Sequence, residues 1–95
     1  MKWGIIVRFE YDSAKSAKNE EKHGIDFETA QELWWGEVDT VLLCHKGERR
    51  YLSVGRIAGE YWAVIHTRRG DATRIISARL ATKEERSRYD RVYNG

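Results

Sequence analysis

The stretch that decides the fold is residues 38–78, VDTVLLCHKGERRYLSVGRIAGEYWAVIHTRRGDATRIISA. Turn dipeptides divide it into four runs rich in β-branched and aromatic residues, which is the pattern of strands joined by hairpins. The runs are Val38–Cys44, Arg50–Ile57, Tyr61–Arg68 and Thr73–Ala78, and the turns are Lys46-Gly47, Ala58-Gly59 and Gly70-Asp71. The chain has no proline, so every strand can form its ladder. We therefore predict a four-stranded antiparallel meander.

Upstream of the meander the sequence predicts one strand and two helices. Residues 4–9 form a short β-branched run typical of a strand. Asp12 can cap a helix from Ser13 to about His23, where Gly24 can adopt the left-handed closing conformation. Asp26 offers a second cap, and apolar residues at helical spacing carry that helix to about residues 35–36.

Downstream, Thr82 and Glu85 have the spacing of a capping box and predict a last helix. The expected fold class is therefore α+β: a four-stranded meander plus an N-terminal strand, packed with two N-terminal helices and one C-terminal helix. With 95 residues, we expect residues 1–95 to form a single domain.

Two-residue turns also predict which strand residues share a face. Under this pairing Leu52 lies opposite Ile65, Ile65 opposite Ile76, and Ala63 opposite both Val54 and Ala78, which gives an apolar core face. The opposite face would carry Tyr51, Ser53, Trp62, Val64, His66, Arg68, Ile75, Ser77 and Arg79. Aromatic rings interleaved with arginines are typical of a surface for single-stranded RNA, but the same pattern fits a second face covered by helices.

Composition excludes several classes of protein. Lys and Arg number 17 against 15 Asp and Glu, so the net charge of +2 does not by itself indicate nucleic-acid binding, although arginines gather in the second half. Cys44 is the only cysteine, which excludes an internal disulfide and a thiolate metal site. The three histidines lack metal-ligand spacing, so we expect no metal or other cofactor. No stretch has the length of a membrane span or the pattern of a signal peptide, and we expect a cytoplasmic protein.

Three blocks of sequence resemble the BrnT family of bacterial toxins. The first runs from Phe9-Glu10-Tyr11-Asp12 through Lys15 and Asn19 to residues 22–30, KHGIDFETA. The second is residues 47–51, GERRY, followed by Val54-Gly55-Arg56. The third comprises residues 67–71, TRRGD, and residues 74–79, RIISAR, followed by Ala81, Glu85 and Tyr89. The blocks occur in order over nearly the whole chain. Leu80 departs from the family, which often has a second basic residue there.

The resemblance implies a fold similar to RelE-type ribonuclease toxins and a ribonuclease activity in a type II toxin-antitoxin system. It also implies an antitoxin of the BrnA kind with a ribbon-helix-helix domain, through which any contact with operator DNA would be made. No generic catalytic motif is present in the sequence. RNA is cleaved without metal when its 2′-hydroxyl attacks the adjacent phosphate, provided that cations stabilise the transition state.

Candidate site residues follow from the family-like motifs and from side-chain chemistry. For catalysis these are Arg69 and Arg79 as guanidiniums, Lys22, and the histidines His23 and His66. For RNA binding they are Arg74, Arg68, Glu48 and Tyr51. Four of them have a plainer alternative: Lys22 and His23 as favourable groups at a helix C-terminus, His66 as a residue that fills the sheet, and Glu48 as a solvated charge.

Two other functions remain open from the residues. One is a noncatalytic RNA- or protein-binding module that acts only through its antitoxin complex, and the other is a subunit that serves the antitoxin without activity. Trp34, Trp35 and Trp62 fit either a partner interface or simple core packing.

Overall fold

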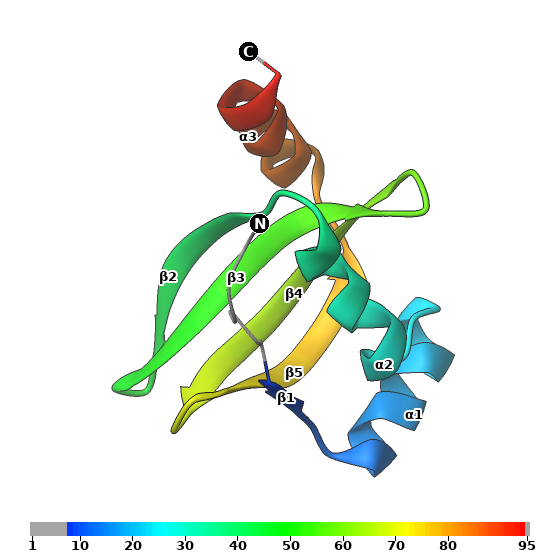
Figure 1. Ribbon diagram of the computed structural model, residues 1–95, viewed down its shortest axis with the longest axis vertical. Helices are drawn as coiled ribbons and strands as arrows, with labels where there is room; N and C mark the ends of the chain where they lie inside the picture. The colour runs from blue at the N-terminus through cyan, green and yellow to red at the C-terminus, as the bar shows by residue number, and fades with distance from the viewer. Residues whose placement is uncertain (1–7, 95) are drawn as a thin grey trace, which may run out of the picture.

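The computed structural model describes residues 8–94, which form one sheet flanked by helices (Figure 1). The elements are β1 (Arg8–Glu10), α1 (Ser13–His23), α2 (Phe27–Ala30), the 3-10 helix η1 (Gln31–Trp35), β2 (Asp39–His45), β3 (Glu48–Ile57), β4 (Glu60–Arg69), β5 (Ala72–Leu80) and α3 (Lys83–Tyr93). The sheet order is β1-β5-β4-β3-β2. This confirms the α+β class and the meander, and β1 joins β5 in parallel. Of the strand predicted over residues 4–9, residues 4–7 lie outside the described residues.

Local signals set the ends of the helices as predicted. The Asp12 carboxylate accepts from the amides of Ala14 and Lys15, and these hydrogen bonds lower its pKa. Gly24 ends α1 at φ 82°, in the left-handed region that favours glycine. Thr82 and Glu85 form the predicted capping box of α3. The helix capped by Asp26 continues to Trp35 but tightens after Ala30 into 3-10 geometry. None of the described helices is long and apolar enough to cross a membrane.

The hairpins β2–β3 and β3–β4 turn through two residues, as predicted. Lys46 and Gly47 both have positive φ, as do Ala58 and Gly59, which is the combination that matches the twist of paired strands. The β3–β4 register is the predicted one, with Arg56 opposite Tyr61. The pairing between β4 and β5 differs from the predicted one. Ile65 lies opposite Ser77 instead of Ile76, and Ala63 lies opposite Arg79 instead of Ala78, because a β-bulge leaves Ile76 without a partner.

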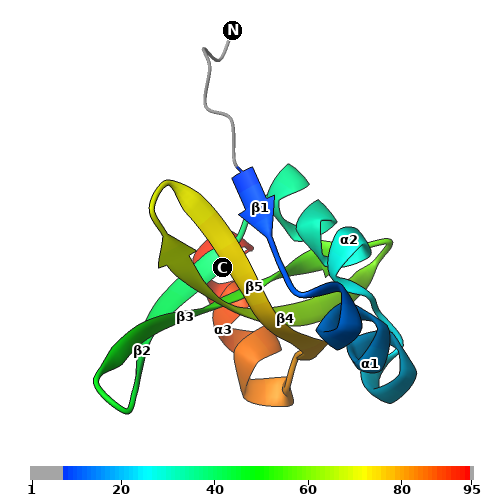
Figure 2. The same cartoon turned by 90° about the horizontal axis from the view of Figure 1, so that it is seen from below.

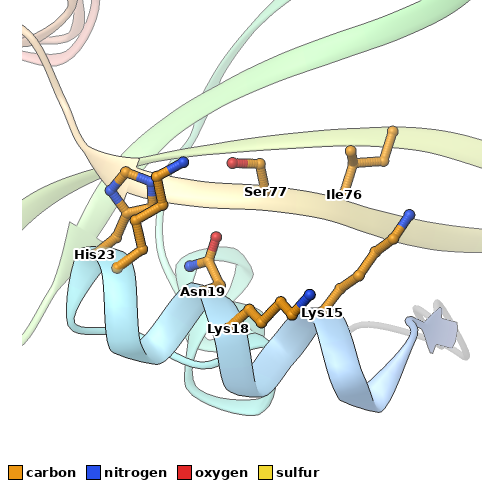
Figure 3. Close-up of a pocket in the computed structure, with 7 residues that line it drawn as sticks. Lys15, Lys18, Asn19, His23, Ile76 and Ser77 are labelled. Atoms are coloured by element: carbon orange, nitrogen blue, oxygen red, sulfur yellow. The ribbon is translucent and has the colours of Figure 1, made fainter.

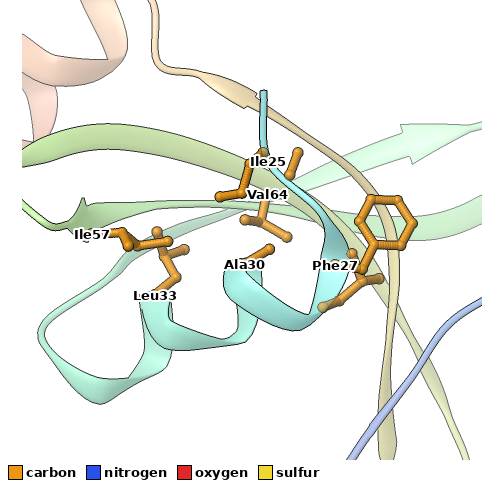
Figure 4. Packing of buried hydrophobic residues seen from close by; sticks show 8 residues of the cluster. Ile25, Phe27, Ala30, Leu33, Ile57 and Val64 are labelled. Atoms are coloured by element: carbon orange, nitrogen blue, oxygen red, sulfur yellow. The ribbon is translucent and has the colours of Figure 1, made fainter. Parts of the chain in front are cut away.

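The bulge changes which residues of β5 share a face, so the predicted core face is wrong at Ala78, which lies opposite Val64 instead of Ala63. Ala78 packs with Val64, Ile75, Phe27 and Leu33 in the core under α2 and η1 (Figure 4). The other core, under α3, contains Leu52, Val54, Ala63 and Tyr89. Both faces of the sheet are therefore covered over part of their area, which agrees with the alternative of a second face covered by helices.

Close approach of η1 to the sheet depends on Gly55. A Cβ added there would lie 2.9 Å from Leu33 Cγ, and Leu33 is fully buried.

The three tryptophans singled out in the sequence differ in burial. Trp34 and Trp62 are half-buried against the core, as core packing predicts, whereas Trp35 is 81% exposed.

The outer edge of β5 is closed by α1. β1 accompanies β5 only from Ala72 to Arg74, and beyond that point α1 lies alongside the strand (Figure 2). The buried Asn19 side chain donates to the carbonyls of Ala78 and Ile25, each at 2.8 Å, and accepts from the Ala78 amide at 3.3 Å. One side-chain amide thus pairs both backbone groups of Ala78 as a neighbouring strand would.

Candidate active site

A small polar hollow opens on the face that also carries α3, at the end of the sheet away from that helix. It has a volume of about 160 Å³, and we call it the strand hollow. Its lining comes from three strands and from α1: Lys15, Glu48, Arg50, Thr67, Arg69, Arg74 and Ile76. Three guanidiniums and one ammonium group therefore face a space of the size of a small anion. The strand hollow brings together three of the residues predicted from the sequence, Arg69, Arg74 and Glu48.

A second hollow of about 250 Å³ continues from the first along α1, and we call it the helix hollow. Lys15 and Ile76 line both hollows. In Figure 3 the side chains of Lys15, Lys18 and His23 follow one side of α1 beside Ile76 and Ser77 of β5. Lys22 also lines this hollow. The predicted residues Lys22 and His23 therefore lie on the same continuous surface as Arg74, and we call the two hollows together the basic cleft.

Carboxylates hold the guanidiniums of the strand hollow in place. Glu10 of β1 accepts from Arg74 at 3.1 Å and from Arg69 at 3.3 Å, and Glu48 accepts from Arg50 at 3.0 Å. The side chain of Arg74 is only 28% exposed, whereas that of Arg69 is 62% exposed. Among the described residues, Glu10 and Glu48 are the carboxylates that form ion pairs with the six Lys and Arg side chains of the cleft, and Asp12 lies near Lys15 and Arg74. Six positive charges against three negative ones leave an excess that attracts an anion.

Arg79 lies on the same face of β5 but outside the lining of both hollows. Its guanidinium makes two parallel hydrogen bonds to Glu85 of α3, at 2.8 and 3.0 Å. This pairing lowers the pKa of Glu85, which also takes part in the capping box, and raises the pKa of Arg79. Arg79 therefore ties the last strand to the start of α3.

Replacing Arg79 with alanine is expected to lower the free energy of unfolding by about 1–2 kcal/mol at pH 7, because Glu85 loses a charged partner in a partly buried position. A carboxyl whose pKa is lower in the folded state stabilises the fold above its unfolded pKa and stops doing so as pH falls through the folded pKa. The difference between wild type and variant should therefore disappear in acid. Urea unfolding at pH 7 and in strong acid, with Arg91→Ala as the exposed α3 control, measures it. A difference that does not depend on pH would contradict the role of this pair.

The other three candidates lie on the opposite face of the sheet. Tyr51, His66 and Arg68 line a third hollow of about 390 Å³ together with Trp34, Thr40 and Thr73. His66 is buried, and burial, with a smaller effect of Arg68, lowers its pKa to about 4. His66 is thus neutral at physiological pH and is separated from the basic cleft by the sheet.

The cleft also contains residues that the sequence did not single out for function. Lys15, Lys18 and Lys22 follow one another along α1 at spacings of three and four residues. Residues at these spacings share one side of a helix, so helical periodicity alone predicts a basic stripe. Arg50 follows the alternation of Leu52 and Val54 onto the same face. Thr67 belongs to the family-like block of residues 67–71, but nothing in the sequence singled out its hydroxyl for the site. Within residues 8–94 no three His, Cys, Asp or Glu side chains gather as metal ligands.

Comparison with models of protein families identifies the family of the chain. A family model described as "Ribonuclease toxin, BrnT, of type II toxin-antitoxin system" matches residues 11–85. The matched segment includes every lining residue of the basic cleft. A search of the curated proteins finds no match to the chain.

Proposed function

Because this chain belongs to the BrnT family of ribonuclease toxins of type II toxin-antitoxin systems, we propose that the basic cleft is its ribonuclease site. There the RNA is cleaved by its own 2′-hydroxyl without a metal ion. The observation that carries the proposal is the strand hollow, where Arg50, Arg69, Arg74 and Lys15 surround about 160 Å³. Guanidiniums match phosphate oxygens with paired donors and stay charged at any physiological pH.

In the proposed reaction the scissile phosphate occupies the strand hollow. Glu48 takes the proton of the 2′-hydroxyl, whose oxygen forms a bond to phosphorus while the bond from phosphorus to the 5′-oxygen breaks. Arg69 and Arg74 stabilise the extra negative charge of the five-coordinate phosphorus. Lys15 lines both hollows and supplies the proton that the departing 5′-oxygen takes up. The products are a 2′,3′-cyclic phosphate and a 5′-hydroxyl.

The helix hollow binds the neighbouring nucleotides. Lys18 and Lys22 are exposed cations there that suit further phosphates, and His23 is half-buried beside them. An imidazole can both give and accept a proton, so His23 is the second candidate for proton transfer. Arg79 acts on this site through the position of β5. Tyr51, His66 and Arg68 lie too far around the sheet for the reacting phosphate and take no part in the chemical step.

A type II toxin has a protein antitoxin. We propose that the partner of this chain is of the BrnA kind, with a ribbon-helix-helix domain, and that operator DNA is contacted only through it. The proposal includes a single domain over residues 1–95 that works in the cytoplasm and arrests growth until the antitoxin binds. The family resemblance stated above supports this part of the proposal.

The experiment that tests the function is incubation of purified chain with RNA in excess chelator. We expect cleavage that leaves 2′,3′-cyclic phosphate ends, and no cleavage of the same RNA carrying 2′-O-methyl groups, because the nucleophile is then blocked. Added antitoxin should stop the reaction. A folded chain that binds RNA but leaves its length unchanged would favour the noncatalytic module instead, and products with 5′-phosphates would contradict attack by the 2′-hydroxyl.

A further inference from the structure

A hollow with aromatic walls lies on the face of the sheet opposite to the basic cleft. Trp34 of η1, Tyr51 of β3 and His66 of β4 surround about 390 Å³, with Arg68 at the exposed rim. We call it the aromatic hollow. The His66 ring stacks on Tyr51 with centroids 5.7 Å apart and meets the edge of Trp34 at 5.1 Å. Aromatic walls of this kind can hold a flat ring in a stacked or edge-to-face arrangement.

His66 carries an unmet hydrogen-bonding group beside this hollow. The residue is 7% exposed, and its Nε2 lies 2.8 Å from Ser53 Oγ, which in turn lies 2.7 Å from Thr40 Oγ1. Its Nδ1 is buried and has no partner among the described residues. Buried polar atoms are nearly always paired, because leaving one unpaired costs the full desolvation penalty. The unpaired nitrogen therefore points to a ligand with a polar edge.

The aromatic hollow and the basic cleft are back to back. Side chains alternate along the strands, so that neighbouring residues serve opposite faces. On β3, Arg50 lines the basic cleft and the next residue, Tyr51, lines the aromatic hollow. On β4, Arg68 lines the aromatic hollow and the next residue, Arg69, lines the basic cleft. A strand of nucleic acid that leaves the cleft around the hairpin end of the sheet thus reaches the aromatic hollow within a short length.

We propose that the aromatic hollow binds one unstacked nucleobase of the single-stranded RNA whose phosphates occupy the basic cleft. The base stacks on the half-buried ring of Tyr51 and hydrogen-bonds through its edge to His66, while Arg68 holds the adjoining phosphate. This inference rests on the proposed function of the cleft, and it adds a site for a base to a site for phosphates.

The test uses a short 2′-O-methyl RNA, which cannot be cleaved, and an abasic oligomer of the same length, which keeps the phosphates and lacks the bases. Tyr51→Ala is expected to weaken binding of the normal oligomer between about 5-fold and about 150-fold, the range for loss of one base–aromatic stack. Binding of the abasic oligomer should stay unchanged. Leu42→Ala, on the same face and 57% exposed, is the matched control. Tyr51→Leu serves if the alanine variant does not fold.

A second readout is the ¹⁵N chemical shift of His66 Nδ1, which should move when the normal oligomer binds and stay in place with the abasic one. If Tyr51→Ala weakened binding of the normal and the abasic oligomer equally, the proposal would be overturned. It would also be overturned if the His66 signal did not move with RNA and moved only with the antitoxin. A mononucleotide that moves the signal while the oligomer does not would also overturn it, in favour of a soluble ligand. If the chain binds the base but cleaves no RNA, the result would contradict the proposed ribonuclease site and support the base site.

Discussion

Arg74→Ala is expected to slow RNA cleavage on the order of 100- to 1000-fold while the chain stays folded, the loss typical when one preorganised donor to a developing negative charge is removed. Arg74 lies in the strand hollow, with its side chain 28% exposed and a hydrogen bond to Glu10. Because its guanidinium is already fixed, it stabilises the transition state with little reorganisation. Initial cleavage rates of purified wild type and variant measure the effect.

Two further variants separate geometry from charge. Arg74→Lys keeps the positive charge but loses the planar pair of donors, so its rate should lie between those of wild type and alanine variant. Arg91→Ala removes the same charge from the exposed side of α3 and should cleave normally. Arg74→Ala that retains the wild-type rate would remove the strand hollow from the active site, whatever the status of the other arginines.

Asn19→Ala is expected to lower the free energy of unfolding by about 2–4 kcal/mol. The substitution removes the partners of three buried backbone groups, namely the carbonyls of Ile25 and Ala78 and the amide of Ala78. Each unpaired buried group costs about 1–3 kcal/mol, and partial access of water at the edge of the sheet offsets part of the sum. Equilibrium unfolding in urea measures the change.

The matched controls lie on the same helix. Glu21→Ala, an exposed position of α1, should change stability by less than about 0.5 kcal/mol. Asn19→Asp keeps the acceptor for the Ala78 amide and loses both donated hydrogen bonds, so it should also be destabilising. If Asn19→Ala were no more destabilising than Glu21→Ala, α1 would be held to β5 by other contacts.

Local structure was predictable from the sequence because the signals are local. Asp12, Gly24 and the Thr82 capping box set the helix ends through groups a few residues apart. The turn dipeptides likewise set the β3–β4 register through their own backbone angles. What could not be predicted was the bulge at Ile76, since Ile75 and Ile76 are adjacent and nothing in the sequence marks which of the two is left unpaired.

The candidate site was predictable in part for the same reason. Arg69, Arg74 and Glu48 follow from motifs next to turns, and Lys22 and His23 from the end of a helix. Their meeting in one cleft depends on how α1 packs against β5, which is a contact between residues 59 positions apart. His66 and Arg68 share a face, as their alternation predicted, but the bulge places Arg79, predicted on that face too, on the face of the cleft.

The bulge in β5 has a consequence for relatives of this chain. Ile76 pairs with no residue of β4, yet it is one of the two side chains that line both hollows of the basic cleft. The residues of β5 before and after Ile76 pair with β4 whether or not Ile76 is present. A homologue can therefore gain or lose a residue at this position and still present Arg74 and Arg79 on the same face of the sheet. In an alignment, position 76 is therefore where we expect a gap within the strand to be tolerated, and where such a gap would merge two compartments into one.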